Sequence, residues 1–420
     1  MVFDEHGWPV DAALRCVLET VSPLGIERVP LTRARGRVLA EDLCASRDLP
    51  PSAVSMMDGY AVRSTDVATV PVGLAVTEEI CAGRQPRFAL AAGQCARIMT
   101  GAPLPAGADG VVRVEGSRRL SGDQVELLES ASIGHHVRPQ GDSMRAGDVV
   151  MQAGCELVPG AIGVLATLKV VQVRVHRLPR VAILSTGDEL EALDAPVDPL
   201  KIPDANSYAL MAQVQALGIE PDLLGIAPDE PVALQAALAR GLEIADVLLV
   251  SGGFSVGEHD YVQQTLQALG VKQHFGRIAM RPGHPLMFGS HAGGHVFGLP
   301  GNPVSSMVCF ELFVLPALRR LMGHRRVCRT EVRARLLEPI RTHPQRTEFV
   351  RVRLTRDDEG RWLARPTGAQ GSALLQSMML ADGLLRAPVG AGGLAAGDEV
   401  RVHLLDQAVF RVADTFGEHT

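Results

Sequence analysis

The sequence predicts a multidomain protein of the α/β and β classes, built around a three-layer α/β domain with a parallel sheet. Near-continuous Val/Ile/Leu runs alternate with helical patterns between residues 180 and 325, which is typical of a parallel sheet covered on both faces. Short β-like runs and Gly/Pro/Asp turns fill residues 49–141 and the region after 327, which indicates additional β domains. The 420 residues, 46% of them hydrophobic, suffice for several cores, because domains have roughly 100–200 residues.

Four domains are expected from these changes along the chain. A mixed N-terminal domain comprises residues 1–46 plus 142–178, and an inserted β domain at 47–141 interrupts it. The α/β domain covers residues 179–326, and a small C-terminal β-barrel domain covers 327–420.

The mixed domain is expected to begin with a helix over residues 9–20, because Ala13, Leu14, Val17 and Leu18 recur at helical spacing. A second helix is expected at 159–168. In the inserted domain, strands are expected at 72–76, 94–99, 111–115 and 124–128.

The α/β domain supplies the candidate ligand sites. Strands are expected at 180–184, 222–226, 246–250 and 295–298, with helices at 207–217, 231–242, 261–269 and 304–321. Asn206 is expected to cap the first of these helices, and Asp229 with Pro231 marks the start of the second. Parallel sheets bind ligands outside the carboxyl ends of their strands, so the loops after residues 184, 250 and 299 are the candidates.

In the C-terminal domain, residues 348–354 alternate as a half-buried strand does. Val350, Val352 and Leu354 fall on one face, and Arg351 and Arg353 fall on the other. A further strand is expected at 399–404, and the Ala/Gly-rich stretch 390–397 is expected to be a loop.

Composition excludes several classes of function. A net charge of −6 and an aromatic content of 4% argue against nucleic-acid binding, so an anionic ligand must be held by locally placed donors. No apolar run approaches the roughly 20 residues that span a membrane, and the acidic start with Asp4 and Glu5 does not resemble a signal peptide. Seven cysteines without a CxxC pair indicate reduced thiols, and we therefore expect a cytoplasmic protein.

The first α/β strand leads into the sequence STGDE, residues 185–189. Gly187 permits a tight turn, and the Ser185 and Thr186 hydroxyls with nearby backbone amides suit an oxyanion. An ordinary strand-to-helix turn capped by a hydroxyl would have the same sequence, so both interpretations stay open here.

The third strand leads into SGGFSVGEHD, residues 251–260. Ser251, Gly252, Gly253 and Ser255 suit close approach of the backbone to a phosphate, although the loop is neither a Walker loop nor a GxGxxG turn. Asp260 either caps the following helix or, beside a phosphate, binds Mg²⁺ that bridges the two negative charges.

Two further loops carry candidate anion-binding residues. Arg281 and His284 flank a Pro-Gly turn, and an arginine can bind a tetrahedral oxyanion through two N–H groups, although turn arginines are often simply solvated. Asn302 and Ser305 precede or begin a long apolar helix, whose N-terminal amides favour an anion.

The inserted domain contributes weaker signals. The pair Met56-Met57 is expected to pack in a core, and Asp58 before Gly59 has the usual sequence of a turn. The histidine pairs 135/136 and 291/295 lack further metal ligands and are expected on the surface.

The order and number of these motifs resemble one family closely, from about residue 10 to residue 405. They read PPSAVSMMDGYAV, RIMTGAPLPAGADGVV, GDSMRAGDVV, LSTGDEL, SGGFSVGEHDY, MRPGHP and GLPGNPVSS. This pattern is similar to that of the molybdopterin molybdotransferases, the family of bacterial MoeA proteins and the E domain of gephyrin.

The resemblance implies an elongated, four-domain homodimer that inserts molybdenum from molybdate into adenylated molybdopterin and releases AMP, with Mg²⁺ as the cation. It also implies contact with the adenylating enzyme of the pathway, while the composition leaves no role for nucleic acid or a membrane. By motif position, the catalytic set is Asp58, Thr100, Asp142, Glu189, Asp229, Asp260 and Arg351, with Glu189 and Asp260 binding the metal. The implied ligand-binding set is Ser185, Thr186, Gly187, Ser251, Gly252, Gly253, Ser255, Arg277, Arg281, His284, Asn302, Ser305 and Ser372.

The chain departs from the family pattern in three places. Ala53-Val54 replaces the usual Asp-Asn, and Asp204-Ala-Asn206 replaces Asp-Thr-Asn. Arg281-Pro-Gly-His284 replaces Lys-Pro-Gly-Lys, and Arg277 also stands at a family lysine position. Histidine is only fractionally charged near neutral pH, so the departures leave open a binding scaffold without turnover, besides an active enzyme. A pyrophosphatase is a third hypothesis, which the two β domains disfavour.

Overall fold

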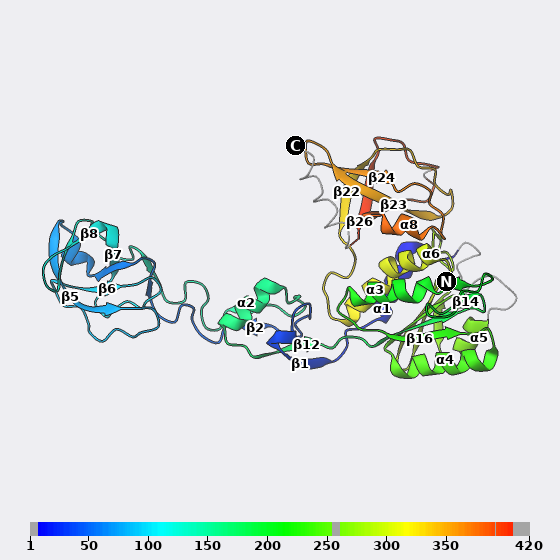
Figure 1. Cartoon of the computed structure of the whole chain (residues 1–420), viewed down its shortest axis with the longest axis horizontal. Coiled ribbons are helices and arrows are strands. Elements are labelled where there is room, and N and C mark those ends of the chain that lie inside the picture. Colours follow the sequence, from blue (N-terminus) through cyan, green and yellow to red (C-terminus); the bar gives the residue numbers. More distant parts are fainter. Residues whose placement is uncertain (1–6, 254–260, 391, 406–420) are drawn as a thin grey trace. The chain divides into compact units, whose positions relative to one another are not determined.

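The computed structural model describes residues 7–253, 261–390 and 392–405 (Figure 1). The chain divides into two compact units, which we consider separately. The first unit comprises Met1–Ala40, Gly154–Val158 and Val173–Thr420, and the second comprises Glu41–Ala153 and Pro159–Gln172. The expected limits of the four domains remain predictions.

The central sheet of the first unit has six strands. Their order is β16 (Asp222–Ala227), β13 (Val181–Thr186), β17 (Val247–Ser251), β21 (Gly294–Leu299), β20 (Met287–His291) and β18 (Lys272–Phe275). The four predicted strands are confirmed, and they are parallel to one another. The sheet continues beyond these four strands with β20, which runs antiparallel to both of its neighbours. A turn of two residues joins β20 to β21, and so short a connection allows only antiparallel pairing.

Helices cover both faces of this sheet. One face holds α4 (Pro231–Ile244) and α5 (Tyr261–Ala268), and the other holds α1 (Val10–Thr20), α3 (Ala205–Gln215) and α6 (Pro303–Cys309) (Figure 1). The helix predicted for 304–321 is one continuous element with a π-helical segment, Phe310–Val314, between α6 and α7 (Leu315–Leu321).

The helix predicted after Asn206 begins earlier than expected. Asp204 is its N-cap, since the Asp204 carboxylate accepts a hydrogen bond from the Ser207 amide at 3.1 Å. The prediction that Asn206 caps this helix is therefore wrong. The Asn206 side chain makes other hydrogen bonds, which are described below with the site. Glu230, rather than Asp229, is the N-cap of α4, and it makes no side-chain capping bond.

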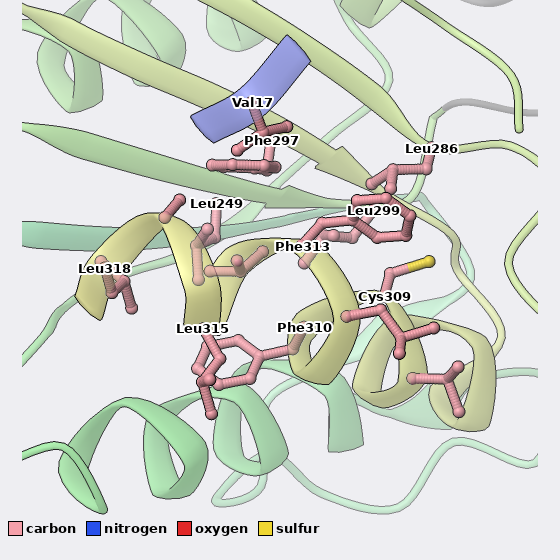
Figure 2. Packing of buried hydrophobic residues seen from close by; sticks show 14 of the residues in the cluster. Val17, Leu249, Leu286, Phe297, Leu299, Cys309, Phe310, Phe313, Leu315 and Leu318 are labelled. Carbon is pink, nitrogen blue, oxygen red and sulfur yellow. The ribbon is translucent and has the colours of Figure 1, made fainter. Parts of the chain in front are cut away.

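The largest core lies between the sheet and the long helix. Leu249, Phe297 and Leu299 from the strands meet Phe310 and Phe313 from the π-helical segment, and all are fully buried (Figure 2). Apolar burial stabilises by about 25 cal/mol per Å², so this cluster is a main source of stability. The same cluster includes Phe349 and Leu384 of the C-terminal domain. The two domains of this unit therefore share one core.

The C-terminal strands close into a five-stranded barrel. The strands β22 (Glu331–Leu336), β23 (Thr347–Arg356), β24 (Trp362–Pro366), β25 (Gly383–Ala387) and β26 (Glu399–Leu404) pair in the order β23-β24-β22-β26-β25, and β25 pairs again with β23. Val350, Val352 and Leu354 are buried inside, as predicted. Arg353 is exposed on the other face, whereas Arg351 is buried there beside α8 (Leu375–Met379).

Several short elements complete the first unit. β1 (Ile26–Pro30) pairs with β12 (Gln172–His176), which joins the two sequence pieces on either side of the predicted insertion. A short 3-10 helix, Leu31–Arg33, follows β1, and β14 (Leu190–Glu191) pairs with β15 (Ile202–Pro203). The two-residue strand β19 (Met280–Arg281) pairs in parallel with the start of β23.

The second unit contains a curled sheet. Its strand order is β7 (Gly110–Arg113), β4 (Gly59–Val62), β6 (Gln94–Ile98), β5 (Val72–Ile80), β9 (Gln124–Leu127) and β8 (Ser117–Arg119). Beside it lie the pairs β2 (Leu43–Cys44) with β11 (Val149–Met151) and β3 (Val54–Ser55) with β10 (Val137–Arg138), the helix α2 (Pro159–Thr167) and the 3-10 helices Ser64–Val67 and Val114–Gly116.

Most predicted elements of this unit are confirmed, with three corrections. The strand predicted at 111–115 ends at Arg113, because a 3-10 helix follows. Met56 and Met57 are 54% and 39% exposed, so the prediction of core packing is wrong. His135 and His136 are half-buried rather than free on the surface. Their ring centroids lie 3.9 Å apart, and the two ring planes are tilted by 52°.

The cysteines and the helices agree with the compositional predictions. All seven cysteines are free thiols. Among the helices that the structure describes, none combines the length and apolar character that crossing a membrane requires.

A buried ion pair yields a stability prediction. Glu311 in the π-helical segment accepts hydrogen bonds from Arg329 at 2.7 Å and Gln213 at 2.8 Å, and both side chains of the ion pair are over nine-tenths buried. Glu311→Gln should lower the free energy of unfolding by about 3 kcal/mol, because it breaks the buried ion pair between Glu311 and Arg329. Urea unfolding measures this change. The control is Arg333→Gln in the exposed Arg333–Glu399 pair, which should cost less than about 1 kcal/mol. Equal losses in the two variants would contradict the prediction.

Candidate functional site

A hydrogen-bond network joins the carboxyl ends of three parallel strands. Ser185 and Ser251 stand opposite each other at the ends of β13 and β17. The Asn206 amide donates to the Ser251 hydroxyl and to the Gly301 carbonyl after β21, both at 2.7 Å. Ser185 donates to the buried Asp204 carboxylate at 2.9 Å. The three loops that the sequence singled out therefore form one structural site.

Glycines allow these loops to approach each other closely. Gly252 and Gly253 adopt φ of 92° and 70°, where L side chains are strained. A Cβ on Gly252 would lie 2.4 Å from the Thr186 carbonyl oxygen. The Thr186 hydroxyl is buried and has no hydrogen-bond partner among the described residues. Because buried hydroxyls are normally paired, Thr186 is suited to bind a ligand. The predicted site residues Ser255 and Asp260 lie outside the described residues.

The turn after β13 brings acidic groups to the same edge. The Gly187 amide donates to the Ala227 carbonyl at 3.3 Å, and the Asp229 amide donates to the Asp188 carboxylate at 3.1 Å. The Glu189 carboxylate lies so close to Gly187 that a Cβ there would be 2.4 Å from its oxygen. Glu189 and Asp229 are thus both near the end of β13, as the motif positions imply.

The acidic groups at the end of β13 suit Mg²⁺ only if substrate phosphates supply further ligands. In the parts of the chain that the structure describes, no group of three or more His, Cys, Asp or Glu could hold a metal ion. Mg²⁺ commonly binds one or two carboxylates together with substrate phosphates. The exposed Glu189 carboxylate suits that arrangement and does not suit a site formed by protein ligands alone.

A second site lies where the α/β domain meets the C-terminal barrel. A cavity of about 210 Å³ is lined by Met280, Arg281, Pro282, Gly283, His284, Pro285, Ser305, Arg346, Gln370 and Ser372. We call it the Arg281 cavity. Two arginines, two serines and an amide give it donors for a small oxyanion. Arg281, His284, Ser305 and Ser372 were predicted, and the structure brings all four together.

A carboxylate, that of Glu348, lies beside Arg281 of the Arg281 cavity. Arg281 lies 3.4 Å from the largely buried Glu348, whose carboxylate also accepts the His343 amide at 2.9 Å. His284 Nδ1 lies 2.7 Å from the Ile278 carbonyl. Burial holds the pKa of His284 below its usual range, and the charges of Arg346 and Arg277 lower this pKa further. His284 is therefore neutral at neutral pH while the cavity holds no anion.

Arg351 lies behind the wall of the cavity. It is 1% exposed, and its guanidinium donates to the Ser377 hydroxyl at 3.1 Å and to the Gly371 carbonyl at 3.0 Å. Burial lowers the pKa of Arg351 to about 10, so it remains charged at neutral pH. It is not among the residues that line the cavity. In this structure, Arg351 supports the loop that carries Ser372.

The Ser372 loop also ties the barrel to α6. The Val304 amide in the first turn of α6 donates to the Ser372 carbonyl at 3.1 Å. The Val304 amide, one of the N-terminal amides that were predicted to favour an anion, is therefore already hydrogen-bonded to the protein. Asn302 is exposed and makes no side-chain capping bond, so nothing in the structure commits it to a ligand.

The second unit has a cavity of its own. It measures about 560 Å³ and is lined by Val54, Ser55, Met56, Thr100, Gly101, Val137, Arg138, Pro139 and Asp142. Asp58 accepts hydrogen bonds from the Thr100 amide at 2.7 Å and the Thr100 hydroxyl at 2.8 Å. These bonds hold the pKa of Asp58 below its usual range. Arg138 lies 2.9 Å from Asp142. Asp58, Thr100 and Asp142, which are far apart in sequence, therefore belong to one polar site.

Several residues of these sites were not predicted from the sequence. Gln370 stands two residues before Ser372 in the same loop and could have been inferred from it. Arg346 and Glu348 reach the Arg281 cavity only because β23 pairs with β19, which no local pattern reveals. Arg277 is exposed and does not line the cavity, and it affects His284 only through its charge. The predicted surface residue His295 is instead half-buried and stacks on Phe288.

Three family models, which match successive parts of the chain, all describe proteins of molybdopterin metabolism. The MoeA N-terminal region, domains I and II, matches residues 8–168. A probable molybdopterin binding domain matches residues 182–320, and the MoeA C-terminal region, domain IV, matches residues 333–405.

Individual relatives give the same result. A molybdopterin molybdenumtransferase of Nostoc sp. (strain PCC 7120) is 44% identical over 304 residues, which cover 71% of this chain and 70% of the relative. The protein of the same name from Staphylococcus aureus (strain N315) is 30% identical and covers 95% of this chain and 96% of its own. The crystal structure of a molybdopterin biosynthesis MoeA protein from Pyrococcus horikoshii OT3 has a TM-score of 0.81 at 30% identity, covering 95% of this chain and 100% of that one.

The strand-end network predicts the effect of one amide-to-acid change. In Asn206→Asp, a carboxylate without N–H donors would face the Gly301 carbonyl and the Ser251 hydroxyl. The free energy of unfolding should fall by about 1 kcal/mol, because the Gly301 carbonyl loses its donor and faces a carboxylate that repels it. Asn302→Asp is the matched control, since its exposed side chain makes no capping bond, and it should change stability by less than about 0.5 kcal/mol. Similar losses in both variants, measured by urea unfolding, would mean that the network does not stabilise the loops.

Proposed function

The chain belongs to the MoeA family of molybdopterin molybdenumtransferases and acts in molybdenum cofactor biosynthesis, and we propose that it inserts molybdenum from molybdate into adenylated molybdopterin with release of AMP. The observation that carries this proposal is the Arg281 cavity, a small donor-lined space that includes Ser305 in the first turn of α6. Its size of about 210 Å³ suits a tetrahedral oxyanion and is too small for a pterin nucleotide.

The larger substrate would bind at the strand ends. Adenylated molybdopterin carries a phosphoanhydride, whose negative charge needs fixed donors. The unpaired Thr186 hydroxyl and the close-packed Gly252 and Gly253 backbone meet that need. Positioned donors of this kind stabilise charge that develops as the anhydride breaks.

The overall reaction balances without an external oxidant or reductant. Two thiol sulfurs of the pterin replace two oxygens of molybdate, which leave as two water molecules with protons from the thiols and solvent. Cleavage of the phosphoanhydride consumes one water molecule and releases AMP. The roles that we propose for the chain are to hold both anions, to orient the thiols toward molybdate and to neutralise charge.

Mg²⁺ is part of the same proposal. Glu189, with Asp260 from the sequence motif, would hold it against the phosphoanhydride. There the cation would neutralise phosphate charge and so assist departure of AMP. The exposed Glu189 carboxylate beside Gly187 supports this role.

We further propose that the working form is a cytoplasmic homodimer that receives its substrate from the adenylating enzyme of the pathway. The seven free thiols suit a reducing compartment. Asp58, Thr100 and Asp142, around the cavity of the second unit, are proposed to serve the same reaction through their polar groups.

Reconstitution tests the proposed reaction. Purified protein with adenylated molybdopterin, Mg²⁺ and molybdate should release AMP and form molybdenum-loaded cofactor in equal amounts, and omission of molybdate should suppress both. AMP is measured by chromatography and loaded cofactor by activation of a cofactor-free molybdoenzyme. Binding of the adenylate without AMP release would instead identify a scaffold, and AMP release indifferent to molybdate would identify a pyrophosphatase.

The Mg²⁺ proposal predicts a selective loss in one carboxylate variant. Glu189→Gln should raise the Mg²⁺ concentration needed for half-maximal AMP release at least about tenfold, because the cation loses a charged oxygen ligand. Glu220→Gln removes an exposed carboxylate that accepts a hydrogen bond from Gln215 at 3.0 Å, and it should leave the Mg²⁺ dependence unchanged. An unaltered Mg²⁺ titration in Glu189→Gln would refute the assignment.

A further inference from the structure

Among the described residues that line the Arg281 cavity, His284 is the one whose side chain can change charge near neutral pH. The other charged lining residues are the arginines Arg281 and Arg346. Ser305, Gln370 and Ser372 do not titrate. A proton gained or lost by the cavity at neutral pH therefore has His284 as its site.

The hydrogen bond of His284 fixes which ring nitrogen carries the proton in the neutral form. Nδ1 lies 2.7 Å from the Ile278 carbonyl oxygen, and a carbonyl can only accept, so Nδ1 donates. In a neutral imidazole Nε2 is then an unprotonated acceptor. Nδ1 is committed to the backbone, and Nε2 is the nitrogen that remains for the cavity.

An unprotonated Nε2 is poorly matched to a deprotonated oxyanion. All oxygens of a dianion such as molybdate accept hydrogen bonds, so a lone pair of Nε2 would face a lone pair of oxygen. Protonation converts Nε2 into a charged donor, and charge-assisted hydrogen bonds are roughly twice as strong as neutral ones. His284 therefore becomes a useful partner only after it gains a proton.

The charges around His284 oppose that proton until an anion arrives. Arg277 and Arg346 repel it, and Arg281 and the buried Arg351 add positive charge to the same region. Glu348 is the acidic group on β23, and it already lies beside Arg281 at 3.4 Å. From α6, Cys309 contacts the Gly283 carbonyl at 3.7 Å, and burial raises the pKa of this thiol, so it contributes no charge. A bound dianion would reverse the balance, since it attracts protons to the cavity.

We propose that the Arg281 cavity takes up about one proton on His284 when it binds a tetrahedral oxyanion, so that binding is proton-coupled. The proposal rests on the proposed function in taking molybdate as the natural occupant. Binding and proton uptake are linked, and each must strengthen the other. Affinity for the oxyanion rises as the pH falls, by at most about tenfold per pH unit for one proton. The gain ends below the pKa of His284 in the anion-free protein.

Calorimetry with molybdate alone tests this proposal on the full chain. Titrations between pH 6.5 and 8.5, in buffers with different ionisation enthalpies, give the number of protons taken up on binding. We expect about one proton at pH 7.5 and an affinity that falls with rising pH. His284→Lys should bind molybdate with no proton uptake and with a much flatter pH dependence, because lysine is already charged. His274→Gln alters a half-buried histidine that bonds Ser290 away from the cavity, and proton uptake should persist in it.

The alternative outcomes are distinct. Binding without proton uptake, uptake that survives in His284→Lys, or no molybdate binding by folded protein at any pH would each overturn the proposal. None of these depends on AMP release, so the proposed reaction can fail or succeed separately. His284→Gln adds a check in case the lysine variant does not fold, because it too should abolish proton uptake.

Discussion

The pairing of β19 with β23 is the constraint on which the second site depends. Met280 and Arg281 of the α/β domain lie in register with Thr347 and Glu348 of the barrel. This two-residue contact fixes the turn that carries Arg281 and His284, and it brings Arg346 to the same cavity. The Val304–Ser372 hydrogen bond and the shared core with Phe349 hold the other side. The cavity exists because two domains with different sequence patterns meet there.

The two proposed anion sites rely on locally arranged donors, as the composition requires. A net charge of −6 offers no general attraction for phosphate or molybdate. The strand-end site relies on the Thr186 hydroxyl, close backbone approach at two glycines and a braced Asn206. The Arg281 cavity concentrates guanidinium groups, with the buried Glu348 beside one of them. Donors in fixed positions can select a small anion that a diffuse basic surface would not distinguish.

The sequence predicted the elements well and their cross-chain relations less well. The parallel strands and the helices followed from periodicity, and the three ligand loops followed from the strand-end rule. The antiparallel β20 was overlooked, because MFGSH has no marked strand pattern beside a glycine-rich turn. Asn206 was predicted as the N-cap of α3, whereas Asp204 is the N-cap. Both residue types cap helices, and only the hydrogen bonds of the folded chain show which of the two does so. Arg351 was expected beside the substrate, and its burial behind the Ser372 loop depends on α8 packing against the barrel. Such long-range contacts leave no local signature, whereas the family motifs did identify Arg281, His284 and Ser372.

Anomalous X-ray scattering would show directly whether the Arg281 cavity holds the oxyanion. Crystals soaked with molybdate and measured at the molybdenum absorption edge would locate the metal without reference to activity. We expect a peak inside the cavity, where the molybdate oxygens lie within hydrogen-bonding reach of Arg281, His284 and Ser372. A molybdenum peak elsewhere in the protein, with this cavity free of metal at saturating molybdate, would contradict it.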